Sequence, residues 1–147
     1  MVGAGGVGCV LAGLAADRLG RTAVTAGALA ISGSCALLAG VTFGAAPALT
    51  VALGLVWGAS AVADSAQFSA AATELSDPRH VGTVLTVQTC CGFTLTLVSI
   101  HLLPELAAAV GWSYAPAVLA LGPAAGIWAM LRLRRHPEAR RLADGRR

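Results

Sequence analysis

Charged side chains are scarce in this sequence. Ten arginines and seven acidic residues are the only charges among 147 residues, and lysine and asparagine are absent. An average soluble domain carries about a quarter charged residues, so these few would poorly cover the surface of one. The mean hydropathy is +0.76. The composition therefore excludes a disordered chain and favours a protein whose solvent is a membrane, and the lack of asparagine excludes N-glycosylation.

Metal-binding and catalytic motifs are also missing. The four cysteines show no C-x-x-C spacing, and the three histidines lie far apart. Structural zinc sites need four such ligands at short, regular spacings, so we expect no metal. The sequence contains no phosphate-binding loop, no G-x-S-x-G turn and no H-E-x-x-H pattern. We accordingly expect no enzymatic activity and no cofactor.

One glycine-rich run matches the pattern of a cofactor-binding motif. Residues 3–8 fit the pattern G-x-G-x-x-G of dinucleotide-binding turns. That motif requires a buried strand before the glycines and an acidic residue about 20 positions later, and neither is present here. Small residues also allow membrane helices to approach closely, and Gly5, Cys9 and Gly13 recur on one helical stripe. We therefore interpret residues 3–8 as a helix-packing surface and not as the cofactor site of a soluble dinucleotide-binding enzyme.

Long uncharged runs dominate the rest of the sequence. They cover residues 1–16, 22–63, 81–104 and 106–131. Because a membrane-spanning helix needs about 20 mostly apolar residues, the longest run holds two spans separated by the glycine and proline of residues 43–47. The sequence thus predicts an all-α, multi-pass bundle of about five spans, the first of them short. The predicted segments are 1–16, 22–43, 47–72, 81–103 and 112–131.

Arginine occupies only alternate connections between these segments. Residues 17–21, 73–80 and 132–147 contain all ten arginines, whereas residues 44–47 and 104–111 contain none. Since arginine is retained on the cytoplasmic side of short loops, we expect a cell (inner) membrane protein with its C-terminus in the cytoplasm. The arginine-rich tail, 132–147, is expected to bind anionic lipid and no nucleic acid.

The most specific motif follows the first segment. Gly13, Asp17, Arg18, Gly20 and Arg21, termed the loop motif below, are followed by a threonine. Gly20 is suited to a tight turn, and the charges could form a network at the membrane surface. The motif resembles the cytoplasmic loop G-x-x-x-D-R-x-G-R-[KR] of the major facilitator superfamily of secondary transporters, with threonine replacing the last base. In that family the loop resembles a latch, whose acid and bases contact the neighbouring half in one access state. The alternative for this chain is that Arg18 and Arg21 only anchor the loop at the cytoplasmic membrane surface.

The resemblance implies a function and a missing partner. An intact member has twelve spans in two halves, so this chain resembles the final five helices of a carrier and lacks an N-terminal half. Such a carrier moves a small solute, here unidentified, by alternating access. Coupling to protons is an expectation from the family resemblance alone. The alternative is a membrane fragment or scaffold that transports nothing.

Polar residues inside the segments are the candidates for a substrate or proton site. A carboxylate within a span costs about 2.5–3.5 kcal/mol on insertion scales, so Asp64 requires an explanation. Asp64 could act in the solute cavity with Gln67, or it could pair with Arg18 or Arg79. Gln88 is the second cavity candidate. Because polar residues occur on two opposed sides of segment 81–103, we expect that helix to be buried between neighbours.

Overall fold

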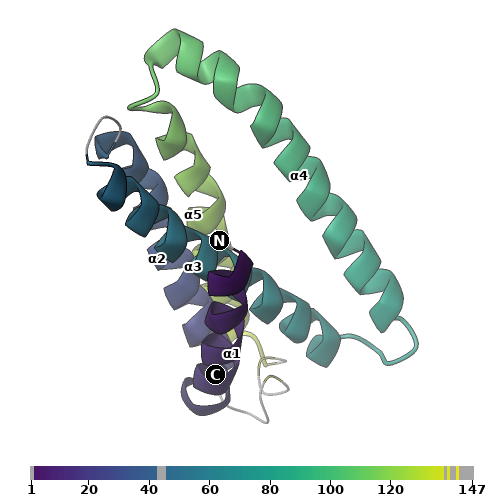
Figure 1. Cartoon of the computed structure of the whole chain (residues 1–147). Helices are drawn as coiled ribbons and strands as arrows, with labels where there is room; N and C mark the ends of the chain where they lie inside the picture. Colours follow the sequence, from purple (N-terminus) through teal and green to yellow (C-terminus); the bar gives the residue numbers. More distant parts are fainter. Residues whose placement is uncertain (1, 43–45, 138, 140–141, 143–147) are drawn as a thin grey trace.

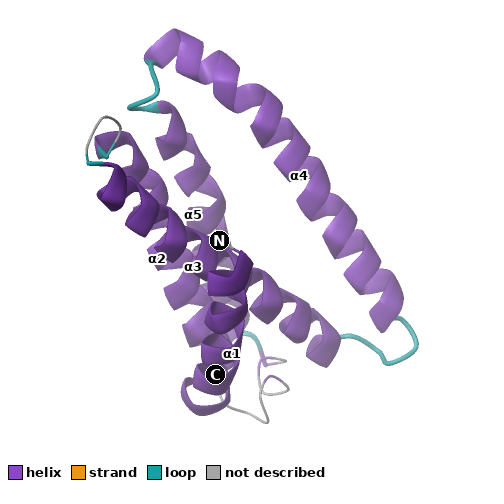
Figure 2. Ribbon diagram, viewed as in Figure 1, coloured by secondary structure: helices purple, strands orange, loops and turns teal. Residues whose placement is uncertain are grey.

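The described chain belongs to the all-α class, as the sequence predicted. The computed structural model describes residues 2–42, 46–137, 139 and 142, and this part contains no strand. Figures 1 and 2 show the arrangement of its helices. The elements are α1 (Val2–Leu19), α2 (Arg21–Val41), α3 (Pro47–Leu75), α4 (Val81–Val110), the 3₁₀ helix η1 (Ala115–Ala120) and α5 (Leu121–Arg135).

Length and composition suit most of these helices to a membrane. Within the described residues, four helical segments are long and apolar enough to cross one: Arg21–Val41, Pro47–Leu75, Val81–Val110 and Ala115–Arg135. The chain therefore has the character of a multi-pass membrane protein. Helix α1, with 18 residues, is not among the four, in line with the shortness of the first predicted segment. Its role as a fifth span stays a prediction.

Helix ends occur where glycine or proline changes the backbone. Gly20 separates α1 from α2 with a φ of 95°, and Gly111 ends α4 with a φ of 87°. Side chains other than glycine rarely adopt this conformation. Pro47 begins α3 at a position where the missing N–H would have no helical partner. The one-residue connection at Gly20 makes α1 and α2 neighbours.

Four helices form a bundle around α2. Helix α2 contacts α1, α3, η1 and α5, while α1 also packs along α3. The α1–α3 contact is tight, because a Cβ atom at Gly8 would lie 2.7 Å from the carbonyl oxygen of Ala59. A Cβ at Gly5 would lie 2.8 Å from Val62, and the thiol of Cys9 donates a hydrogen bond to the Val62 carbonyl over 3.3 Å. Small residues on one face of α1 thus let the two backbones approach.

Gly13 does not take part in this packing. A Cβ atom added at Gly13 would meet no atom within 4 Å. Our expectation that Gly13 continues the close-packed stripe of Gly5 and Cys9 is therefore wrong. No neighbouring atom of the described residues therefore requires a small residue at this position of α1.

Helix α4 lies apart from the bundle. Its main contacts are with α3 and η1, and Figure 1 shows it joined to the other helices mainly near its two ends. Ala107 is its only buried residue. The expectation that segment 81–103 is buried between neighbours is wrong for the described chain. Several of its hydroxyl groups form hydrogen bonds within the helix instead. Thr86, Thr94 and Ser99 donate to carbonyls four residues earlier in α4.

Several helices differ in extent from the predicted apolar segments. Helix α4 continues through Pro104 to Val110, beyond the predicted end at residue 103, and α3 continues to Leu75. Proline removes only one backbone donor, so neighbouring turns preserve the helix. The predicted segment 112–131 is divided into η1 and α5, and α5 extends to Arg135. Hydropathy marks the apolar part of a helix, whereas backbone hydrogen bonds decide where it ends.

The ends of several helices meet at one end of the bundle. The start of α2 contacts the end of α3 through an ion pair between Arg21 and Glu74. After α5, Ala139 and Leu142 are fully buried in a cluster with Ala71, against which Leu75 and Leu133 pack. We call this region, where α1, α3 and α5 end and α2 and α4 begin, the arginine end. It carries every described arginine.

Candidate functional site

An arginine from the loop motif forms the best-defined polar cluster in the described chain. Arg21 is the first residue of α2, and its Nη2 lies 2.6 Å from Oε1 of Glu74 on α3. Its Nε donates to Oε2 of the same carboxylate over 3.1 Å, which makes the pair bidentate. Its Nη1 donates to Oε1 of Gln67 over 2.9 Å. Planar guanidinium groups favour this geometry.

The side chains of this cluster are largely shielded from solvent, so their hydrogen bonds contribute to holding the helices together. The side chains of Arg21 and Glu74 are 12% and 29% exposed, and Gln67 is 3% exposed. Gln67 and Glu74 stand seven residues apart, with Ala71 between them, so they lie on one face of α3. A single guanidinium group therefore satisfies two acceptors from that face. The cluster fixes the start of α2 against the last two turns of α3.

The loop motif thus divides into two parts. Arg21 is directed into the bundle, and Gly20 is buried at the turn, whereas Asp17 and Arg18 are exposed. The sequence interpretation placed all three charges in a surface network and did not identify Glu74 as the partner of Arg21. The spacing of Glu74 from Gln67 on one helical face was the available signal. Only the packing of α2 on α3 shows which arginine meets it.

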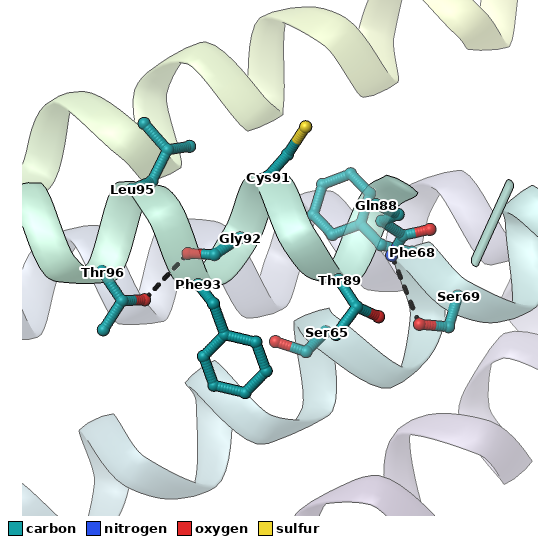
Figure 3. A pocket seen from close by; sticks show the side chains of 10 residues that line it. All are labelled: Ser65, Phe68, Ser69, Gln88, Thr89, Cys91, Gly92, Phe93, Leu95 and Thr96. Atoms are coloured by element: carbon teal, nitrogen blue, oxygen red, sulfur yellow. Dashed lines mark hydrogen bonds between the residues drawn. The ribbon is translucent and has the colours of Figure 1, made fainter. Parts of the chain in front are cut away.

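A cleft lined by both apolar and polar side chains lies between α3 and α4. It has a volume of about 640 Å³, and Gln88 of α4 reaches across it, donating from Nε2 to the Ser69 hydroxyl of α3 over 3.3 Å (Figure 3). Thr96 donates to the carbonyl of Gly92 in its own helix. The side chains of the cleft are uncharged. They belong to Ser65, Phe68, Ser69, Gln88, Thr89, Cys91, Gly92, Phe93, Leu95 and Thr96.

The chemistry of this cleft suits a solute with polar and apolar parts. An amide and several hydroxyls offer hydrogen-bond donors and acceptors, and Phe68 and Phe93 offer apolar ring surface. Ligand pockets generally combine such apolar walls with a few polar groups that fix orientation. The cleft can therefore orient a small molecule by hydrogen bonds without supplying a charge.

The three predicted site residues occupy different surroundings. Gln88 lines the cleft, whereas Gln67 is buried on the α2 side of α3, where it accepts from Arg21. Asp64 is half-buried and accepts a hydrogen bond from the adjacent Ser65 hydroxyl over 3.2 Å. In the described part of the chain, neither Arg18 nor Arg79 forms an ion pair with Asp64. Ser65 lines the cleft, so Asp64 is its sequence neighbour without lining it.

The glycine run and the cysteines have no cofactor geometry in the described residues. Residues 3–8 lie inside α1 rather than in a turn between a strand and a helix. That placement does not provide the backbone turn on which dinucleotide binding depends. No group of three potential metal ligands occurs among the described side chains, and the four cysteines are unpaired thiols.

No protein-family model, no curated protein and no solved structure matches this chain.

Proposed function

We propose that the chain forms the C-terminal helices of a secondary carrier of the major facilitator type. The cleft between α3 and α4 is the observation that carries this proposal. It combines a predicted cavity residue, Gln88, with uncharged polar and aromatic side chains on two helices of membrane-spanning length. The resemblance of the loop motif to that of the major facilitator superfamily indicates the class of carrier. The solute is then a small molecule that binds partly through hydrogen bonds.

The loop motif suggests how access to the cleft would alternate. Arg21 is held by Glu74 and Gln67, so it belongs to the rigid frame of the bundle. Asp17 and Arg18 are exposed at the same turn and can contact the other half of the carrier in one access state. Such contacts bias an equilibrium between two conformations by their differential free energy. Asp64 is the candidate proton site beside the cleft.

The alternative is a membrane scaffold that moves no solute. In favour of it, α4 is exposed along most of its length and so offers a broad surface to another protein. A scaffold, however, would not require Gln88 to face a cleft between two helices. The two functions therefore predict different effects of a substitution at Gln88 on solute uptake.

Transport by the product of the complete reading frame that contains this chain tests the proposal. Everted membrane vesicles from expressing cells are energised, and uptake of a panel of small radiolabelled solutes is compared with that of vesicles lacking the protein. We expect specific uptake of at least one uncharged, amphipathic panel member. Gln88→Ala should raise its half-saturating concentration severalfold, because a hydrogen bond made to the solute is lost.

Two matched variants sharpen this experiment. Thr86→Ala changes an exposed hydroxyl of the same helix that bonds to its own backbone and lies outside the cleft, so it should leave uptake unchanged. Asp17→Ala should reduce uptake more than membrane abundance, because the acid biases access rather than folding. Vesicles that contain the inserted protein but take up no panel member would favour the scaffold. Equal effects of Gln88→Ala and Thr86→Ala would remove the cleft from the solute path.

A further inference from the structure

The two sides of α5 differ sharply in their surroundings. One side packs into the bundle: Pro123 lies against Gly33, Gly126 against Leu29 and Phe68, and Met130 is buried. Leu133 continues this side against the cluster of Ala71 and Leu142. These α5 residues recur at intervals of three and four, so they form one stripe. The opposite stripe faces away from the bundle.

That outward stripe changes from apolar to basic at the arginine end. Leu121 and Trp128 are 68% and 63% exposed, and Arg132 and Arg135 follow at intervals of four and three, both exposed. Trp128, Arg132 and Arg135 therefore stand above one another on the same face. An apolar helix face that ends in an aromatic ring and then in basic residues is typical of a membrane–water boundary.

The tryptophan and one arginine are already in contact. The guanidinium carbon of Arg132 lies 5.3 Å from the centre of the Trp128 ring. This distance is within the range of a cation–π interaction, which restrains the guanidinium while leaving its edge donors available. A guanidinium group presents several N–H donors in one plane, which match the oxygens of a phosphate. The pair is therefore organised to bind an anionic headgroup at the level of the ring.

We propose that Trp128, Arg132 and Arg135 form a binding site for an anionic phospholipid on the outward face of α5. The arginines bind the headgroup phosphate. The Trp128 ring and the apolar helix surface that precedes it on α5 contact the acyl chains close to the headgroup. Charge complementarity selects an acidic lipid over a zwitterionic one. The site does not depend on transport, so it applies equally to a carrier or a scaffold.

The expectation that the arginine-rich tail, 132–147, binds anionic lipid falls partly on residues outside those that the structure describes. Ala139 and Leu142 turn back onto α3 and are fully buried. These two described residues of the tail therefore face the bundle and not the lipid. Among the described residues, the stripe of Trp128, Arg132 and Arg135 has the geometry of a lipid site.

Fluorescence quenching of Trp128 tests the site. In the full chain, Trp57→Phe and Trp112→Phe leave Trp128 as the only tryptophan, and the protein is reconstituted into two bilayers of the same headgroup composition. Both contain phosphatidylcholine with a minor fraction of phosphatidylglycerol. In one bilayer the phosphatidylglycerol carries brominated acyl chains, and in the other an equal amount of phosphatidylcholine carries them. We expect stronger quenching by the brominated phosphatidylglycerol, equivalent to an enrichment of about fivefold for each arginine near the surface.

Three arginine variants identify the residues responsible. Arg132→Gln and Arg135→Gln should each remove most of the excess quenching. Arg134→Gln changes the net charge by the same amount, but Arg134 lies beside the packed stripe of Met130 and Leu133, so the excess should persist. Circular dichroism checks that every variant is folded.

Other results would overturn the proposal. Equal quenching in the two bilayers would show that the stripe does not select acidic lipid. Absence of quenching in both would show that another protein surface covers it. An equal effect of Arg134→Gln would show diffuse attraction of charge instead of a site.

Discussion

At the scale of single residues, Arg21 differs from the arginines around it in what surrounds its side chain. It is largely buried and bonded to two acceptors on α3, whereas Arg18 and Arg79 are exposed. A charge in that position is tolerable only with good hydrogen-bonding geometry, because an unpaired buried charge is strongly destabilising. The Glu74 carboxylate and the Gln67 amide meet this requirement.

Removal of this guanidinium should destabilise the bundle. Arg21→Ala removes the hydrogen bonds that this guanidinium donates to Glu74 and Gln67, and we expect a loss of about 1–3 kcal/mol in the free energy of unfolding. Arg79→Ala removes the same charge from an exposed position and should change that free energy by less than about 0.5 kcal/mol. Helicity followed during titration with a denaturing detergent measures both.

A double-mutant cycle separates the ion pair from nonspecific effects. Arg21→Ala combined with Glu74→Ala should cost less than the sum of the two single variants, because each single change already breaks the same pair. Additive losses would indicate that the two side chains contribute independently.

At the scale of helices, the glycines of α1 have unequal roles. Gly8 allows α1 to touch the backbone of Ala59 in α3, whereas Gly13 has open space where a side chain would be. In the sequence these two glycines look alike. Their difference arises from what faces each glycine in the folded chain, so of the two only Gly8 limits how closely α1 packs on α3.

Alanine at these two positions should have opposite effects on stability. Gly8→Ala places a Cβ atom against the Ala59 carbonyl and should lower the free energy of unfolding by about 1–3 kcal/mol, because the helices must separate. Gly13→Ala adds no contact and should raise it by about 0.5–1 kcal/mol, since alanine favours the helix more than glycine does. Unfolding in detergent micelles measures both, and a loss of stability in Gly13→Ala would contradict the open space found there.

At the scale of the whole molecule, every described arginine lies at one end of the helices. These residues occur at the end of α1, the start of α2, the connection from α3 to α4 and the end of α5. The contacts of Arg21 with α3, and of Ala139 and Leu142 with the same helix, hold this end together. Because arginine is retained in the cytoplasm, we propose that the arginine end faces that compartment.

Reporter fusions test this orientation. A reporter fused after Arg147 should be cytoplasmic, and one inserted at Ala45, between α2 and α3, should lie outside. A pair consisting of alkaline phosphatase and green fluorescent protein gives opposite signals on the two sides, so each position has its own control. Both positions on the same side would contradict the proposed topology.

The sequence by itself determined the helical class, the approximate places of the long helices and the arginine distribution. These follow from composition and local order: apolar runs form helices whose backbone bonds are internal, and glycine or proline interrupts them. Gly20 is the clearest case, since its turn depends only on local backbone conformation.

Only the tertiary structure decided which polar groups meet. Glu74 of α3 pairs with Arg21, Gln67 of α3 contacts α2, and Gln88 of α4 contacts α3. Helix α4 lies apart, although its composition suggested burial. Residues such as Gln67 and Gln88, distant in sequence, are indistinguishable by type. Their partners depend on how the helices rotate and cross, which arises from the packing of many small side chains and is not encoded in any single motif.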